Sequence, residues 1–377
     1  MGKPLEDIRV LDFSRYIPGP YATLRLAEQG ADVVLVEPAN GEPSRTLSFQ
    51  KDGQGLGFLV HNRMKRSIAL DLKDDKDKEI AKELAMKADV IVESFRPGVM
   101  ERMGLSYESL KQLHPSIIYC SISGYGQHTA GLRHLGSHDL NYMAVSGILS
   151  QLKDEQGKPV HPSIQLADYI GGLAASEKIM AALIQRFRTG KGAAIDLSLT
   201  DSLYSMMNMN RVIHDEAGYP RGIREISGEY VCYHIYETSD QRYVALAALE
   251  KKFWHAFCRL AGRSDWLDQQ FAKAEKGSSI YEEVSAYFKR YPLSEWTEIS
   301  VQVDCCLTPV LEMGELDQWP LLKARALQLE ADGLNQIGTV FPSEKAGGEA
   351  PRHGDHGEQI IQEWLQTTKN HLHIRRE

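Results

Sequence analysis

The chain has 377 residues, of which 42% are hydrophobic and 25% charged, and this composition is typical of a globular protein rather than a disordered one. The formal net charge of −8 argues against nucleic acid or an anionic membrane as a partner, because both need a basic surface. No stretch approaches 18 consecutive apolar residues, so we expect no membrane-spanning segment, and five cysteines without a CxxC pair favour reduced thiols and a cytoplasmic location.

The first half of the chain alternates short β-branched runs with helical patterns. Strands are predicted at 8–13, 33–37, 67–72, 90–93 and 117–123, and helices at 21–30 and 78–87. This order predicts an α/β fold with a mostly parallel sheet that is covered by helices on both faces. Ligands of such sheets gather at the carboxyl ends of the strands. The loops concerned follow Phe13, Glu37, Glu93 and Ser123.

A long helix is predicted over 168–188, and it ends before Gly190 and Gly192. Its first turn contains Gly171 and Gly172, each of which costs about 1 kcal/mol relative to alanine in a helix. The pair therefore indicates close approach, either by another helix or by a ligand.

The second half of the chain predicts a second domain. Residues 216–228 are rich in glycine and charge and are predicted to be a linker. Antiparallel strands over 230–249 and helices over 253–296 follow, and a closing helix is predicted at 358–365. We therefore expect a large Rossmann-like domain that begins with residues 1–215, a smaller α+β domain at 229–310, and a segment at 311–377 that returns to the large domain.

The common catalytic fingerprints are missing. A GxG begins at Gly124 after a strand, but Thr129 stands in the place of the third glycine, and the sequence has no P-loop, GxSxG or HExxH motif. A dinucleotide oxidoreductase is therefore a weak alternative. His353, Asp355 and His356 have metal-ligand spacing but form an incomplete ligand set, so no metal site is predicted.

Three polar groups stand where a core or a plain loop would not need them. These are SHDLNY from Ser137, LADYIGG from Leu166, and Glu250 after the apolar run YVALAAL. Taken singly, Asp168 could be a helix N-cap, His138 a histidine with its hydrogen bonds satisfied inside the protein, and Glu250 a surface carboxylate at a strand end. Their combination requires another explanation.

Together with other segments, these groups resemble the class III coenzyme A transferase family (CaiB/BaiF type), which also contains the α-methylacyl-CoA racemases. The matching segments, in chain order, are PGPYATLRLAEQGADVVLVEP, NRMKRSIALDLK, ADVIVESFRPGVMERMGL, SISGYGQ, GSHDLNYMAVSG, LADYIGG and TGKGAAIDLSLTDSLY. The resemblance covers nearly the whole chain. It implies an interlocked homodimer with the active site between the large domain of one subunit and the small domain of the other.

The resemblance also implies roles for the three polar groups. Asp168 corresponds to the catalytic carboxylate, which attacks the thioester in the transferases and transfers a proton in the racemases. His138 corresponds to the second acid/base group of the racemases, and Glu250 to a glutamate that orients or tunes it. Asp139, Gly171, Gly172 and Ile17 are expected to support these groups.

SHDLNY, Glu250 and the segment VDCCLTPVLEMGEL favour the racemase branch, although Ser137 replaces the small residue, usually glycine, that precedes the histidine. Removal of an α-proton needs a base, an opposed acid and donors for the enolate oxygen. His138 and Asp168 would be the opposed groups, with backbone N–H groups at the start of the Asp168 helix as the donors. The alternatives are a transferase that uses a carboxylic acid acceptor, and a non-catalytic CoA-binding protein.

The implied substrate is an acyl-CoA thioester, and no other cofactor is expected. The resemblance assigns a group of residues to the CoA site, each of whose charges could otherwise be a solvated surface charge: Arg45, Lys65, Arg66, Leu72, Lys73 and Arg96. Met206, Met207 and Met209 are expected either to face the acyl chain or to be core residues.

Overall fold

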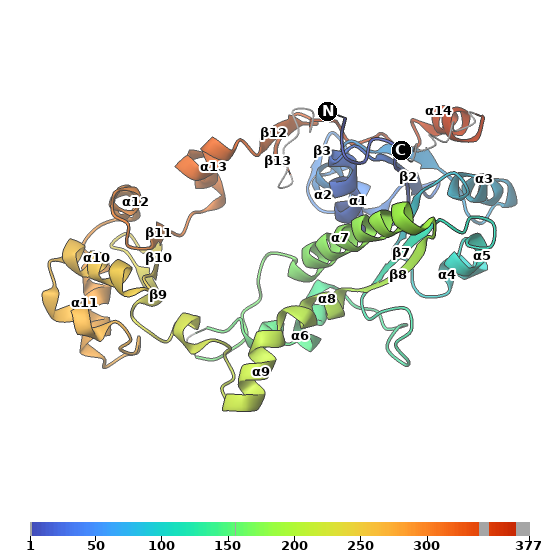
Figure 1. Cartoon of the computed structure of the whole chain (residues 1–377). Coiled ribbons are helices and arrows are strands. Elements are labelled where there is room, and N and C mark those ends of the chain that lie inside the picture. The colour runs from blue at the N-terminus through green and yellow to red at the C-terminus, as the bar shows by residue number, and fades with distance from the viewer. Residues whose placement is uncertain (1, 155, 339–346, 367–377) are drawn as a thin grey trace, which may run out of the picture. The chain divides into compact units, whose positions relative to one another are not determined.

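The computed structural model describes residues 2–154, 156–338 and 347–366. The chain divides into two compact units, of which the first combines Met1–Met206 with Arg325–Glu377 and the second is Met207–Ala324 (Figure 1). The second unit therefore starts before and ends after the range of 229–310 that the sequence suggested. Helix α9 (Asn208–Ala217) accounts for the earlier start.

The first unit is built on a six-stranded sheet in which every pair of neighbours is parallel. Its strands are β1 (Arg9–Asp12), β2 (Asp32–Glu37), β5 (Arg66–Ala69), β6 (Val90–Glu93), β7 (Ile118–Ser123) and β8 (Ala193–Ser198). The sheet order is β5-β2-β1-β6-β7-β8. This is the doubly wound order of a Rossmann-like sheet, which confirms the predicted α/β class.

Both faces of this sheet are buried. Successive side chains along a strand point to opposite faces, so each strand contributes side chains to two cores. On one face the core contains Val10, Val33, Val90 and Ile118, packed with α1 (Pro18–Glu28) and α7 (Leu166–Thr189). On the other face the core contains Leu11, Val34, Ile91 and Tyr119, packed with α3 (Asp75–Ala85) and α14 (Gly357–Ile361). Ile80 and Leu84, which are four residues apart on α3, both pack in the second core.

The two glycines in the first turns of α7 are explained by helix packing. A Cβ atom on Gly172 would lie 2.7 Å from the carbonyl oxygen of Pro18, at the start of α1, and 2.9 Å from Tyr21. A Cβ atom on Gly171 would collide with the side chain of Leu199, the first residue of α8 (Leu199–Met206). Of the two explanations left open by the sequence, the structure therefore supports close approach by neighbouring helices.

The direction of winding reverses between β1 and β6, because β2 and β5 lie on one side of β1 while β6, β7 and β8 lie on the other. Ligands of open α/β sheets bind in the crevice at such a point. The loops that follow the two strands are in contact there, since the backbone N–H of Arg15 donates a 2.9 Å hydrogen bond to the hydroxyl of Ser94.

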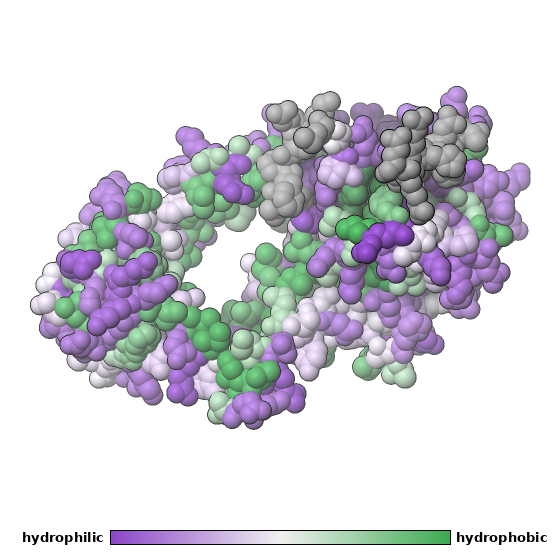
Figure 2. All heavy atoms as spheres, viewed as in Figure 1, coloured by the Kyte–Doolittle hydropathy of each residue, from purple (hydrophilic) through white to green (hydrophobic). Residues whose placement is uncertain are grey.

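The second unit has a separate core. An antiparallel sheet in the order β11-β10-β9 combines β9 (Tyr233–Glu237), β10 (Tyr243–Ala247) and β11 (Leu307–Pro309). Helices α10 (Lys251–Ala261), α11 (Ser279–Phe288) and α12 (Leu293–Gln302) pack around fully buried Trp254, Trp266 and Trp296. In α9, by contrast, no residue is buried, and Figure 2 shows hydrophobic side chains over this helix.

The remaining described elements are short. They are η1 (Pro43–Thr46), β3 (Gln50–Lys51), β4 (Gln54–Gly55), α2 (Leu56–Asn62), α4 (Val99–Arg102), α5 (Tyr107–Leu110), α6 (Asp139–Val145), η2 (Ile148–Ser150), η3 (Arg224–Ile226), η4 (Ser264–Gln269), η5 (Met313–Gln318), α13 (Pro320–Arg325), β12 (Gln328–Ala331), β13 (Leu334–Ile337) and η6 (Gln362–Gln366). Within the described ranges, no helix is long and apolar enough to cross a membrane.

Candidate active site

Asp168 is the third residue of α7, and its side chain is half-buried. Burial raises the pKa of this carboxyl group to about 7, and the negative charge of Asp139 contributes to the shift. In the part of the chain that the structure describes, no group donates a hydrogen bond to the carboxylate oxygens of Asp168. The Asp168 carboxyl group therefore holds its proton to higher pH than an ordinary aspartate, and its oxygens are available to a substrate.

Asp139 is the group that caps α7. Its Oδ1 accepts hydrogen bonds from the backbone N–H groups of Ala167 at 2.7 Å and Asp168 at 3.1 Å. Burial nevertheless raises the pKa of the Asp139 carboxyl group, against the effect of these two hydrogen bonds. The expectation that N–H groups at the start of α7 would bind an enolate oxygen is wrong for this pair, because both are used by Asp139.

His138 comes directly before Asp139 and is the N-cap residue of α6. Its backbone N–H donates to Oδ1 of Asn141 at 3.0 Å, and its side chain is exposed. The Tyr142 hydroxyl donates to the Ser137 carbonyl at 3.0 Å, which fixes the chain on the other side of the histidine. Since consecutive Cα atoms are about 3.8 Å apart, the contact of Asp139 with Asp168 brings both predicted catalytic residues to the start of α7.

Arg96 lies in the loop after β6 and is exposed. Its guanidinium group lies beside Gly136, because a Cβ atom on that glycine would be 3.6 Å from Nη2 of Arg96. Within the described ranges, its side chain makes no hydrogen bond or ion pair. Arg96 therefore has a positive charge without a described acidic partner, and it lies beside Gly136, which precedes His138 by two residues. Its role toward phosphate stays a prediction.

The loop that carries Arg96 is held by Glu93, the last residue of β6. Oε2 of this buried carboxyl group accepts a 2.8 Å hydrogen bond from the backbone N–H of Phe95. Burial raises the pKa of Glu93 to about 7, and the charge of Asp196 acts in the same direction. The sequence predicts a ligand-facing loop after Glu93, but no local pattern identifies the Glu93 side chain as the support of that loop.

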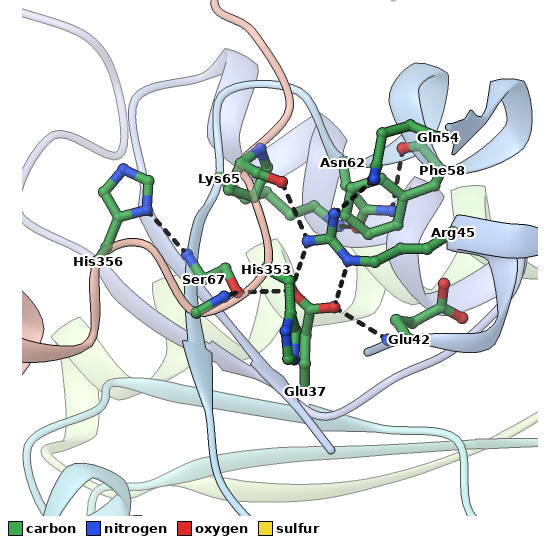
Figure 3. Close-up of polar contacts among 12 residues, drawn as sticks. Glu37, Glu42, Arg45, Gln54, Phe58, Asn62, Lys65, Ser67, His353 and His356 are labelled. Carbon is green, nitrogen blue, oxygen red and sulfur yellow. Dashed lines mark hydrogen bonds and ion pairs between the residues drawn. The ribbon is translucent and has the colours of Figure 1, made fainter. Parts of the chain in front are cut away.

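Arg45, one of the cations assigned to CoA, is buried in an internal network (Figure 3). Its guanidinium group donates to both carboxylate oxygens of Glu37 at 2.6 Å, and also to Gln54 and to the carbonyl oxygen of Pro351. It lies over the ring of Phe58 at 3.7 Å from the ring centre. All of these contacts indicate a structural role for Arg45.

Lys65 is also buried and fully paired. Its ammonium group donates to Asp12 at 3.2 Å, to Asn62 at 2.8 Å and to the carbonyl oxygen of Pro20 at 3.0 Å, and burial lowers its pKa. The three donors of an ammonium group are therefore all satisfied inside the protein.

Arg66 forms two hydrogen bonds with the carboxylate of Asp32 and one with Glu363. Arg45 and Lys65 are paired as well. The exposed cations of the predicted CoA group are therefore Lys73 and Arg96. Leu72 packs against the second core of the sheet. For Arg45, Lys65 and Arg66, the assignment to CoA therefore depends on the family resemblance alone.

The remaining predicted residues are distributed over both units. Ile17 is the N-cap residue of α1, in the loop after β1. Glu250 belongs to the second unit, where it is the exposed N-cap residue of α10, and its role toward His138 stays a prediction. Met206 and Met209 are both 55% exposed, which contradicts the interpretation that they are core residues.

His353 and His356 of the return segment both contact backbone groups in the first part of the chain. His353 Nε2 lies 3.0 Å from the carbonyl oxygen of Pro38, and His356 Nδ1 accepts a hydrogen bond from the Ser67 N–H at 3.4 Å. Among the described residues, no group of three His, Cys, Asp or Glu side chains is arranged to hold a metal ion.

Comparison with known proteins relates this geometry to one family. The model of CoA-transferase family III matches residues 5–356. The human succinyl-CoA:glutarate CoA-transferase is 37% identical over 71% of this chain, and the match spans 61% of that protein. The human alpha-methylacyl-CoA racemase is 33% identical, over 83% of this chain and 79% of the relative. The acetyl-CoA:oxalate CoA-transferase of Acetobacter aceti is 29% identical over 96% of both chains.

Solved structures agree with these matches. The crystal structure of a CAIB/BAIF family protein from Brucella suis has a TM-score of 0.84 at 26% identity, over 97% of this chain and all of that chain. The structure of Rv3272 from M. tuberculosis has a TM-score of 0.81 at 27% identity, over 95% of this chain and 99% of the other. The α/β architecture is therefore shared over almost the full length.

Proposed function

The chain belongs to CoA-transferase family III, and from this premise we propose that it removes and returns the α-proton of a 2-methylacyl-CoA thioester, as an α-methylacyl-CoA racemase does. The members of this family that match the chain include both CoA-transferases and acyl-CoA racemases, so the protein is an enzyme of one of these two kinds. The choice between the two depends on the groups around Asp168.

One observation carries the proposal: Asp139 connects the two predicted proton-transferring residues through the chain and through a backbone hydrogen bond. It follows His138 in the chain, and it bonds to the backbone of Asp168, whose pKa is raised to about 7 by burial and by the Asp139 charge. A general acid or base works best when its pKa is near the operating pH. A nucleophilic carboxylate has no such requirement and would gain from staying fully ionised.

In the proposed reaction, one of the two groups takes the α-proton as the C–H electron pair moves into an enolate. The other group then gives a proton to the opposite face of the same carbon. His138 and Asp168 exchange these roles when the opposite enantiomer is the substrate. The substrate is converted without an acceptor acid, and the thioester bond is never broken.

The second candidate is a CoA-transferase, which is the activity named for two of the relatives above. In this reaction the Asp168 carboxylate attacks the thioester carbonyl, a mixed anhydride forms, and CoA leaves as the thiolate. The thiolate then attacks the Asp168 carbonyl, releases the first carboxylic acid, and the enzyme-bound CoA passes to the acceptor acid. The specific observation in favour is that no described group donates a hydrogen bond to the oxygens of Asp168, which leaves them free to attack.

For the CoA portion of the substrate, we propose that Arg96 and Lys73 contact the phosphates, because both are exposed and neither has a carboxylate partner among the described residues. We also propose a homodimer. The exposed apolar side chains of Met209 and Val212 on α9, and of Ile184 and Phe187 on α7, support it, since a monomer gains nothing from exposing them.

The test is incubation with a 2-methylacyl-CoA in deuterated water, followed by mass spectrometry of both the thioester and the protein. Uptake of one deuterium without an acceptor acid, abolished in His138→Ala, is the expected result. No uptake, with a mass increase trapped on Asp168 once an acceptor acid is supplied, would show that the enzyme is a transferase. Tight CoA binding with neither signal would identify a non-catalytic CoA-binding protein.

A further inference from the structure

Tyr169 follows Asp168 in the first turn of α7, and its ring lies where three helices meet. The ring packs edge-to-face against Tyr21 of α1, with the two ring centres 5.1 Å apart, and its centre lies 5.8 Å from that of His61 in α2. The Tyr169 hydroxyl is 3.2 Å from Nε2 of His61, which is a hydrogen-bonding distance. The residue next to the reactive carboxyl group is therefore connected to two other helices.

The direction of this hydrogen bond is set by the other ring nitrogen of His61. Nδ1 lies 2.8 Å from the carbonyl oxygen of Gly57, one turn earlier in α2. A carbonyl oxygen only accepts, so Nδ1 carries the proton and donates it. Burial lowers the pKa of His61 to about 4, and the charges of Lys65 and Arg63 act in the same direction, so the ring is neutral at physiological pH. Nε2 is then an acceptor, and the Tyr169 hydroxyl donates to it.

His61 is held firmly in its own helix. Its side chain is 5% exposed, and the bond to Gly57 fixes the orientation of the ring. The helix itself is anchored on the sheet, because Phe58 and Leu59 are buried against Leu35 of β2. The hydrogen bond from Tyr169 therefore connects the start of α7 to a rigid partner.

Contacts from three helices converge on the first turns of α7. Helix α6 contributes Asp139, which accepts the backbone N–H of Asp168, α1 contributes Tyr21, which packs closely because Gly172 has no Cβ atom, and α2 contributes His61. Among the described residues, no group donates a hydrogen bond to the carboxylate oxygens of Asp168. The placement of this carboxyl group therefore depends on the backbone of the turn that carries it and on the packing around that turn.

We propose that His61 and Tyr169 are positioning residues, which together hold the first turn of α7 so that Asp168 presents its carboxyl group to the substrate. The proposal rests on the proposed function in one respect, namely that Asp168 is the reactive carboxylate. It applies whether Asp168 transfers a proton or attacks the thioester. A displacement of about 1 Å at a reacting group can slow a reaction about 100-fold. Loss of the hydrogen bond should therefore affect turnover more than binding.

The first part of the experiment is steady-state kinetics of Tyr169→Phe, which keeps the ring and removes the donor. The reaction followed is the one that the unsubstituted enzyme catalyses in the deuterium-uptake test above. We expect kcat to fall about 5- to 50-fold, with KM within about twofold of its original value. The acid limb of the pH profile of kcat/KM should move to lower pH, because a loosened turn admits water to Asp168, whose pKa is raised to about 7 by burial.

The second part tests whether an acceptor at position 61 is what Tyr169 requires. His61→Leu removes the acceptor and should lower kcat as much as Tyr169→Phe does. His61→Gln supplies an amide oxygen that can accept from the hydroxyl, and kcat should stay within about threefold of the original value. Tyr107→Phe removes a hydroxyl from α5, which packs against the second core on the other face of the sheet, and this matched control should change neither kcat nor KM.

The third part reports on the turn without turnover. Hydrogen–deuterium exchange of peptides over 166–172, measured by mass spectrometry on the full chain, should be about threefold faster or more in Tyr169→Phe and His61→Leu. Faster exchange with unchanged kcat would mean that the bond is only structural, and an equal loss of kcat in His61→Gln and His61→Leu would mean that the bond to Tyr169 is not what matters. Either result overturns the proposal, as would unchanged exchange. If the unsubstituted enzyme turns over no acyl-CoA, the proposed function fails, yet the exchange rates still decide whether the pair holds this turn.

Discussion

Two groups of charged residues in the first unit differ in how they are compensated. Around β2, the buried side chains of Arg45 and Lys65 are matched to the carboxylates of Glu37 and Asp12. Around β6 and the start of α7, the charges of Arg15 and Arg96 have no described acidic partner, and the carboxyl group of Asp168 is shifted toward its neutral form. The first group is satisfied inside the protein, and we propose that the second meets a ligand.

The family resemblance assigns charged residues of both kinds to one site. Their different pairing distinguishes the residues that maintain the fold from those that are available to a substrate. Charges that are satisfied internally should affect mainly folding when they are replaced. Replacement of charges that are left unsatisfied should affect mainly activity. Because such charges can destabilise the folded state, some of these replacements should raise the free energy of unfolding. The following predictions test that division, from the largest expected effect to the smallest.

Replacement of Asp168 by alanine should lower kcat/KM for an acyl-CoA by about 100- to 10,000-fold, because the central acid/base or nucleophilic group is lost. Steady-state kinetics with the unsubstituted protein as reference measures the effect. Glu83→Ala, which removes an exposed carboxylate from α3, is the control and should leave kcat/KM unchanged. A loss of less than fivefold at Asp168 would remove it from the chemistry.

Arg45→Met should lower the free energy of unfolding by about 3 to 5 kcal/mol, because it leaves the buried carboxylate of Glu37 without its partner. Urea denaturation measures the change, and the double variant Glu37→Leu/Arg45→Met should recover part of it. If Arg45→Met instead weakened CoA binding tenfold with less than 1 kcal/mol of destabilisation, Arg45 would belong to the CoA site after all.

Asp168→Asn should raise the free energy of unfolding at pH 8 by about 1 to 3 kcal/mol. The range extends to low values because the Asp168 side chain is partly exposed, and solvent weakens the effect of its charge. The carboxyl group has a pKa of about 7 in the folded protein against a usual value of 3.8. Between these values the folded state binds more protons than the unfolded state, so stability falls as pH rises through this window and then levels off. Thermal unfolding at pH 8 and at pH 3.5 checks this, since the gain should disappear at the lower pH.

Asp139→Asn should move the acid limb of the pH–rate profile to lower pH by about 1 unit, because it removes the charge that helps to raise the pKa of Asp168. The asparagine oxygen still accepts the two N–H groups at the start of α7, so the fold should be retained. The profile of kcat/KM between pH 5 and 9 shows the shift. An unchanged profile, with intact circular dichroism, would mean that burial alone sets this pKa.

The fold was largely predictable because its strands are short β-branched runs at βαβ spacing. For β6 the predicted bounds coincide with Val90–Glu93. Strand β8 was missed, since AAIDLS carries a polar residue in its centre and is recognisable mainly by its pairing with β7. Edge strands with a mixed pattern depend on such tertiary contacts rather than on local sequence preference.

The candidate site was predictable only in part. Family motifs pointed to Asp168 and His138, but no local pattern shows that Asp139 caps a helix that begins 27 residues later in the chain. The partners of Arg45, which include Glu37 and the carbonyl group of Pro351, are likewise brought together only by the sheet and the return segment. An arginine three residues past the first strand of a parallel sheet is a signal that could have pointed to Arg15, whose side chain has no described acidic partner.

The first unit cannot complete its contacts until the return segment has been synthesised. The carbonyl group of Pro351 completes the Arg45 network, the N–H of Gly354 donates to the Ser67 hydroxyl at 2.8 Å, and Trp364 Nε1 donates to Asp32 at 2.8 Å. At about 5 to 20 residues per second, the ribosome makes Pro351 about 15 to 60 seconds after Arg45. Throughout that interval the nascent sheet lacks these contacts at its β2 and β5 side, so its final closure must follow the emergence of the entire second unit.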